Sequence, residues 1–248
     1  MSWVKGVVKR SFKKIKRLLG YQYVLLYTDS RGDNIPGHQH YAHYSKRLNA
    51  NFVVDAFLCP EKWTTILDFL GHYQSCLDRK KYDWIILHCG IVDASPRHQS
   101  IALEKIYRSK KKIFDEVFGE AYIQEYLSSD FGVEYEGEKT INMYSLNMAE
   151  QKLLPVLRNI PNLIWISSNR IVPGWRGNYW KERPANINIV EDYANLFLCQ
   201  LPCSRTIDLM QWDYDLVQKF TYDNIHPNQL GSDLIYEMIL DKIRRING

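Results

Sequence analysis

Hydrophobic and polar positions alternate along the chain in blocks that predict strands followed by helices. Short apolar runs stand at 23–29, 51–58, 82–89, 163–167 and 206–210, which is typical of buried strands. Longer segments of helical character lie at 41–48, 63–77, 98–160, 187–201 and 230–246, with a polar, glycine-containing break near 128–139. Strands that alternate with helices predict an α/β fold, a three-layer α/β/α sandwich around a five-stranded parallel sheet.

Residues that directly follow the predicted strands are the first candidates for chemistry, because such sheets bind ligands beyond the carboxyl ends of their strands. Ser30 stands in the turn after the first strand, and Asp223 and His226 stand in the loop before the last helix. Acyl transfer by a serine needs a base that takes the hydroxyl proton and a carboxylate that orients that base. An ordinary turn serine, a capping aspartate and a surface histidine are the alternative interpretation.

The loop after the third predicted strand holds Gly90, Asp93 and Arg97. Arg97 can hold an anionic or carbonyl oxygen of a substrate, or it can pair with Asp93 for a structural purpose. We take all three as candidate oxyanion or substrate-binding residues.

A second polar loop, at 169–184, follows the fourth predicted strand and contains Asn169, Trp175 and Arg183. Aromatic faces beside amide, guanidinium and carboxylate groups suit stacking on sugar rings and hydrogen bonding to hydroxyls. Arginines in such a loop can also accept an acidic sugar or a phosphate. An aromatic surface loop without a ligand is the alternative.

The order of three segments resembles the SGNH/GDSL hydrolase superfamily over residues 23–246. Asp-Ser follows the first strand, Gly90-x-x-Asp93 follows the third, and Asp223-x-x-His226-Pro-Asn precedes the last helix. The resemblance implies an SGNH/flavodoxin-like sheet, with Ser30 as nucleophile, His226 as general base and Asp223 as the residue that orients it. It implies no metal and no organic cofactor.

Three departures concern the oxyanion hole that the resemblance implies. Thr28 stands where the family has a glycine before the Asp-Ser pair, the loop at 59–61 has no glycine, and Val92 replaces an asparagine. Of the oxyanion donors that the resemblance implies, only the backbone N–H of Ser30 is present in this sequence. Loss of one such donor costs about 100- to 1000-fold in rate. We expect Arg31, Arg97 or backbone N–H groups of the loop at 59–61 to replace the missing donors.

The function that these patterns favour is a serine esterase that removes acyl groups, above all acetyl, from a carbohydrate or another acylated small molecule. One alternative is an O-acetyltransferase of surface-polysaccharide biosynthesis that uses the same triad. Another is a non-catalytic SGNH-like protein that binds glycan or serves as a scaffold.

The first 20 residues differ from the rest of the chain, which predicts a basic amphipathic helix at 1–20 and one domain at 21–248. Seven lysines and arginines and no acidic residue occur there, while apolar residues recur at helical spacing. Such a helix suits an anionic membrane surface. A solvated helix packed on its own domain and a contact with a polynucleotide are the alternatives, although the net charge of +4 does not by itself indicate a nucleic-acid-binding protein.

The chain shows no apolar run of about 18 residues and no signal peptide. Its five cysteines are an odd number without metal-site spacing, and we interpret them as free, mostly buried thiols in a reducing compartment. Together with the basic segment at 1–20, they predict a cytoplasmic protein at the inner face of a membrane.

Overall fold

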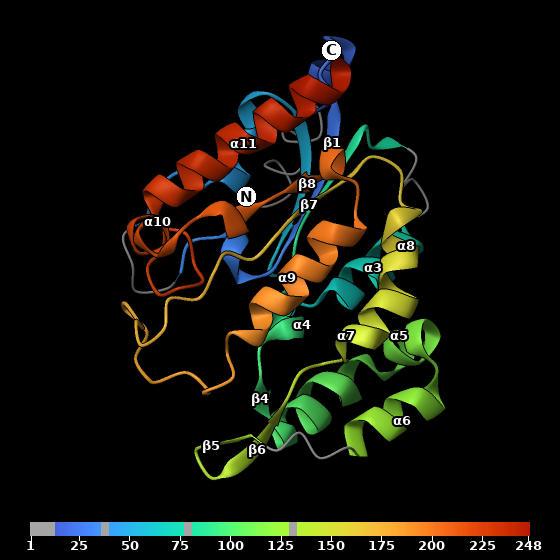
Figure 1. The fold of residues 1–248 in the computed structure, drawn as a ribbon. Coiled ribbons are helices and arrows are strands. Elements are labelled where there is room, and N and C mark those ends of the chain that lie inside the picture. Colours follow the sequence, from blue (N-terminus) through green and yellow to red (C-terminus); the bar gives the residue numbers. More distant parts are fainter. Residues whose placement is uncertain (1–12, 36–39, 77–80, 129–132) are drawn as a thin grey trace, which may run out of the picture.

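The computed structural model describes residues 13–35, 40–76, 81–128 and 133–248, and a parallel sheet lies at its centre (Figure 1). The five strands run in the order β2-β1-β3-β7-β8, and all neighbours pair in parallel. Their bounds are β1 Tyr23–Thr28, β2 Val53–Leu58, β3 Trp84–His88, β7 Leu163–Ile166 and β8 Thr206–Ile207. The predicted five-stranded parallel sheet is therefore confirmed.

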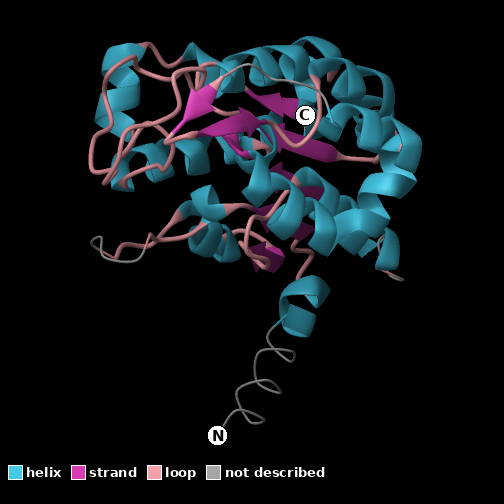
Figure 2. Ribbon diagram, turned by 90° about the horizontal axis from the view of Figure 1, so that it is seen from below, coloured by secondary structure: helices cyan, strands magenta, loops and turns pink. Residues whose placement is uncertain are grey.

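Helices cover both faces of the sheet, as Figure 2 shows from another side. Alternate residues of one strand enter different cores: Leu25 packs with one set of helices, while Val24 and Leu26 pack with the other. The first face carries α3 Ile66–Ser75, α4 Ile91–Ala94, a π-helix Ile101–Tyr107, α5 Arg108–Phe118, α6 Glu120–Ser128, α7 Leu146–Met148, a π-helix Ala149–Leu153, α8 Leu154–Arg158 and α9 Ile189–Gln200. The second carries α2 Tyr44–Arg47, a 3-10 turn Leu48–Ala50, another at Leu209–Gln211, α10 Tyr214–Phe220 and α11 Gln229–Asn247. These layers confirm the predicted α/β/α sandwich.

A small antiparallel sheet interrupts the segment for which mainly helix was expected. It consists of β4 Arg97–His98, β6 Glu138–Ile141 and β5 Glu134–Tyr135, in the order β4-β6-β5 (Figure 1). Strands this short carry no detectable periodicity, and β4 meets β6 only because the chain folds back on itself. Short α10 was likewise not predicted.

Two basic side chains of the N-terminal segment, those of Lys13 and Arg17, face its own domain. Residues 13–18 are helical, whereas residues 1–12 of the predicted helix at 1–20 lie outside the described residues. Lys13 pairs with Asp55, and Arg17 lies 2.6 Å from Asp83. The outward side is apolar, with exposed fractions of 53% for Ile15, 80% for Leu18 and 70% for Leu19. Among the described residues, no helix is both long and apolar enough to cross a membrane.

The cysteines differ from expectation in their burial. All five are free, but Cys59, Cys199 and Cys203 are exposed and only Cys89 is buried. The expectation of mostly buried thiols was wrong, because three of them stand in loops or on the outer side of α9.

Candidate active site

Ser30, His226 and Asp223 form one continuous line of hydrogen bonds. The Oγ of Ser30 lies 2.9 Å from Nε2 of His226. The Nδ1 of His226 lies 2.9 Å from Oδ2 and 3.1 Å from Oδ1 of Asp223. A hydroxyl, an imidazole and a carboxylate in this order are the arrangement that serine acyl transfer requires.

The turn that carries Ser30 is held by its neighbours. A 3-10 turn, Ser30–Gly32, starts directly after β1, and the Oδ1 of Asp29 accepts the backbone N–H of Arg31 at 3.0 Å. A Cβ on Gly32 would lie 2.0 Å from Oγ1 of Thr28. Thr28 therefore fits at the position where the resemblance implies a glycine, because residue 32 has no side chain.

The loop that carries Asp223 and His226 is clamped by asparagines. Asn224 has a φ of +75° and accepts the N–H of Val172 at 2.8 Å, while Nδ2 of Asn169 donates to the carbonyl of Asn224 at 2.8 Å. Oδ1 of Asp223 accepts the backbone N–H of His226 at 2.8 Å. Asn169 therefore positions the loop from behind instead of facing a substrate.

The electrostatic environment keeps Asp223 ionised. Burial opposes ionisation of this carboxyl, but hydrogen bonds from His226 and the nearby charges of His226 and Arg183 outweigh it and lower its pKa. Arg183 donates to the carbonyl of Asp223 at 2.7 Å and lies 3.5 Å from its Oδ2. An ionised Asp223 favours the proton on Nδ1 of His226, which leaves Nε2 free to accept the hydroxyl proton of Ser30.

Ser30 and His226 open into a cleft of about 390 Å³. The small antiparallel sheet and the loop at 169–184 supply much of its wall. Other lining residues that matter below are Trp63, Val92, Arg97, Tyr135, Tyr179 and Arg183. A cleft of this size suits a small ligand.

A larger open groove of about 1350 Å³ lies over α3 and α5 and shares Trp63 and Ile101 with the cleft. None of the three hydrogen-bonded residues lines it. We therefore place the chemistry in the smaller cleft, because a reacting carbonyl must contact the serine hydroxyl.

Few donors are available for an oxyanion. The backbone N–H of Ser30 has no acceptor in the described part of the chain. Cys59 has a φ of +44°, the left-handed conformation that favours glycine, but its N–H already donates to the carbonyl of Thr28 at 2.8 Å. The N–H of Glu61 donates to Thr64, and the side chain of Val92 has no donor. The expected help from the N–H groups of Cys59 and Glu61 is therefore not available.

Arg31 does not line the cleft. Its guanidinium is buried and donates to both carboxylate oxygens of Asp29, at 3.0 and 2.8 Å, and to Oγ of Ser168 at 3.0 Å. The expectation that Arg31 donates to an oxyanion was wrong, because the carboxylate of Asp29 binds its guanidinium under the edge of the sheet.

Gly90 and Asp93 also lie outside the cleft. Gly90 has a φ of +130° and starts α4. Oδ1 of Asp93 accepts the backbone N–H of Ile66, the first residue of α3, at 3.1 Å. It also accepts the hydroxyl of Tyr144 at 2.9 Å, within the core. Burial raises the pKa of Asp93 to about 7. Both residues are structural here, which corrects their expected contact with substrate.

Only one of the three expected residues of the loop at 169–184, Arg183, lines the cleft. Trp175 packs against the second core, whereas Tyr179 and Arg183 line the cleft. The sequence reading also missed Trp63 and Tyr135, because the loop before α3 and strand β5 carry no motif that would have indicated them. Of the expected substrate-binding residues, the structure brings Arg97 and Arg183 to the cleft.

Comparisons with known proteins concern the fold. Neither a family model nor a curated protein sequence matches the chain. The solved lipase/acylhydrolase from Enterococcus faecalis aligns with a TM-score of 0.50 and 17% identity, over 90% of this chain and 95% of that chain. A protein from Lactobacillus plantarum aligns with a TM-score of 0.51 and 14% identity, over 91% of this chain and 97% of that one.

The chain shares the fold of these two solved structures, a three-layer α/β/α sandwich around a five-stranded parallel sheet. Identity to both solved structures is 17% or lower, so the likeness extends to the fold and no further. What the chain can do chemically is therefore argued from the contacts among Ser30, His226 and Asp223.

Proposed function

We propose that the chain is a serine ester hydrolase of the SGNH type, with Ser30 as nucleophile. The observation that carries the proposal is the 2.9 Å contact between Oγ of Ser30 and Nε2 of His226, continued to the carboxylate of Asp223. The same contact argues against a non-catalytic protein, in which nothing would hold the hydroxyl against an oriented imidazole.

The geometry supports a two-step reaction. Nε2 of His226 takes the proton as Oγ of Ser30 attacks the ester carbonyl, and the Ser30 N–H donates to the new oxyanion. The bond to the alcohol then breaks, and His226 returns the proton to the departing alkoxide. Water repeats the steps on the acyl-serine and releases a carboxylic acid.

Within this activity we propose an acyl group as small as acetyl and a carbohydrate as the alcohol. The rings of Trp63, Tyr135 and Tyr179 line the cleft, and such faces suit stacking on sugar rings. Transfer of the acyl group to a sugar in place of water would use the same residues, and product analysis with an acetyl donor distinguishes the two reactions.

The experiment that tests the proposal is labelling of the purified protein with a fluorophosphonate probe. Wild type is expected to react, and Ser30→Ala and His226→Ala are expected to lose labelling. Ser95→Ala is the matched control, because Ser95 lines the same cleft without contacting His226. Labelling that persists in Ser30→Ala, or a folded wild type that stays unlabelled, contradicts the proposal.

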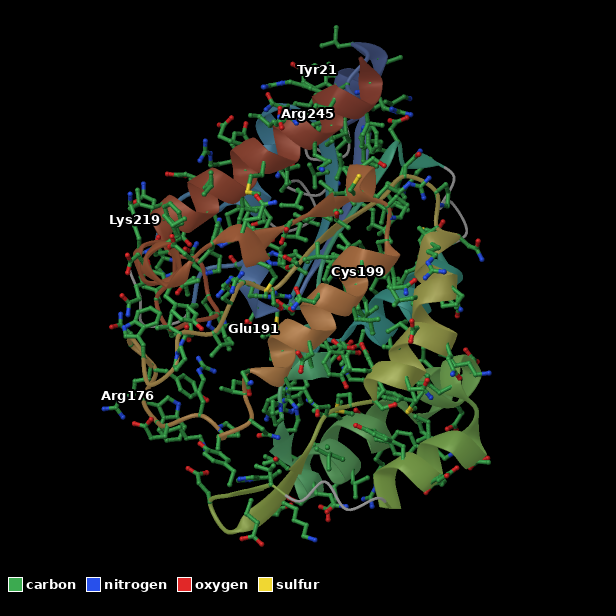
Figure 3. The ribbon with its side chains drawn as sticks, in the orientation of Figure 1. Tyr21, Arg176, Glu191, Cys199, Lys219 and Arg245 are labelled. Atoms are coloured by element: carbon green, nitrogen blue, oxygen red, sulfur yellow. The ribbon has the colours of Figure 1, made fainter. Side chains whose placement is uncertain are left out.

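We also propose that the outward side of residues 13–19 contacts an anionic lipid surface. Ile15, Leu18 and Leu19 expose their apolar side chains, and Lys14 beside them is exposed as well. The segment leads into the start of β1, so it lies at the end of the sheet opposite the cleft. Figure 3 places Tyr21 and Arg245 at this upper end and Arg176 of the loop at 169–184 far from them.

A further inference from the structure

Two arginines of the cleft each keep an N–H donor without an acceptor. Nη2 of Arg97 donates to the carbonyl of Val92 at 2.6 Å, and Nη2 of Arg183 donates to the carbonyl of Asp223 at 2.7 Å. The Nε atoms of both arginines are buried and have no partner in the described part of the chain. Buried donors are almost always paired in folded proteins, and an oxygen of a water or of a ligand in the cleft can supply the missing acceptors.

Asp223 lies 3.5 Å from Arg183 through its Oδ2, so the positive charge left over in the described wall of the cleft is that of Arg97. Lys181 pairs with Glu136 at 2.8 Å, and Glu182 lies 3.2 Å from Arg176, so these neighbours are already paired. Among the described residues, no carboxylate lies within ion-pair distance of Arg97. Burial lowers the pKa of Arg97 to about 10, which still leaves it protonated at neutral pH.

Aromatic rings hold both guanidinium groups in the wall of the cleft. Cζ of Arg97 lies 5.2 Å from the ring centroid of Trp63, and Cζ of Arg183 lies 4.2 Å from that of Tyr179. Ring contacts fix the plane of a guanidinium and leave its edge for hydrogen bonds.

We propose that the substrate carries an anionic group, a carboxylate or a phosphate, which Arg97 and Arg183 bind while Ser30 attacks the ester. This inference rests on the proposed hydrolase function and adds the substrate class, an acylated acidic carbohydrate. Guanidinium edges match the oxygens of carboxylate and phosphate groups, which neutral sugars lack.

Three acetylated substrates test the charge requirement: an acetylated methyl glucoside, the matching methyl glucuronate and the matching 6-phosphate. Wild type is expected to hydrolyse one anionic ester with a kcat/KM about 10- to 100-fold above the neutral ester, mainly through KM. In Arg97→Met this ratio is expected to fall about tenfold, because Arg183 still contacts the anion. The matched control Arg245→Met removes a surface arginine at the opposite end and leaves the ratio unchanged.

Several outcomes would overturn the inference. One is a wild-type kcat/KM that is about equal for the anionic and the neutral ester, and another is an anionic-to-neutral ratio that does not change in Arg97→Met. A third is an equal loss of kcat/KM on all three esters in Arg97→Met, which would place Arg97 at the oxyanion instead. If wild type hydrolyses no ester, the proposed function fails, and thermal stabilisation of wild type still tests the anion site. Methyl glucuronate or glucose 6-phosphate must then stabilise the protein more than methyl glucoside does. The same thermal stabilisation of wild type tests the anion site if Arg97→Met does not fold.

Discussion

Replacement of Asp223 by asparagine tests the proposed triad most directly. Oδ1 of Asp223 accepts the backbone N–H groups of His226 at 2.8 Å and Ile225 at 3.2 Å, so the amide oxygen of an asparagine must take that place. The amide NH₂ then replaces Oδ2, which lies 2.9 Å from Nδ1 of His226. Nδ1 is forced to accept, and the ring proton moves to Nε2, which no longer accepts from Ser30.

The expected loss in kcat is about 10⁴-fold, because the wrong tautomer removes the general base while the shape of the site is kept. This corresponds to about 5.4 kcal/mol of transition-state stabilisation. The assay is steady-state hydrolysis of p-nitrophenyl acetate, together with the second-order rate of fluorophosphonate labelling.

Asp213→Asn is the matched control for this prediction. Oδ1 of Asp213 caps α10 by accepting the N–H of Leu216 at 2.9 Å, and asparagine caps a helix about as well. Its activity is expected to equal that of wild type. A folded Asp223→Asn variant with a kcat within about tenfold of wild type would refute the role of this carboxylate.

Three further predictions concern stability and binding. The carboxyl of Asp93 has an ordinary pKa of 3.8, raised to about 7 in the fold, so its contribution is complete below 3.8 and is lost as pH rises through 7. The free energy of unfolding is expected to fall by on the order of 2 kcal/mol more in wild type than in Asp93→Asn between pH 5 and 8. Serine at both Leu18 and Leu19 is expected to weaken binding to anionic vesicles at least about tenfold, since each leucine contributes about 1.5 kcal/mol or more when buried. Gly177→Ala is expected to cost more than about 1 kcal/mol and to slow hydrolysis, because Gly177 has a φ of +53° and its added Cβ would lie 2.2 Å from the carbonyl oxygen of Tyr222, next to the triad.

Controls and contrary results are specific to each measurement. Urea unfolding at pH 5 and pH 8 tests the first prediction. It would be contradicted if the free energy of unfolding changed by the same amount between these pH values in wild type and in Asp93→Asn. Leu230→Ser changes another exposed leucine, and an equal effect on vesicle sedimentation would exclude a role for the N-terminal segment. Gly174→Ala introduces strain at a φ of +69° with no atom within 4 Å of the new Cβ, so it is expected to cost less than Gly177→Ala; equal costs would contradict the predicted collision.

The sequence determined the sheet and the positions of the three triad residues along the chain. Apolar runs of strand length are a local signal, and burial of both faces of a parallel sheet makes that signal strong. Asp223 and His226 stand three residues apart, so their contact is formed within one loop. Ser30 follows the first strand, and parallel strands bring their carboxyl ends to a common edge.

Which of the remaining polar residues face that edge was decided only by the tertiary structure. Arg31 and Arg97 are both arginines that follow strands, but the carboxylate of Asp29 captures the first under the sheet, while the small antiparallel sheet places the second in the wall of the cleft. Trp63 and Tyr135 reach the cleft from segments about 70 residues apart that no local pattern connects. A side chain's direction in a loop depends on partners that are distant in sequence, because the backbone there lacks the regular period that defines a strand or helix face.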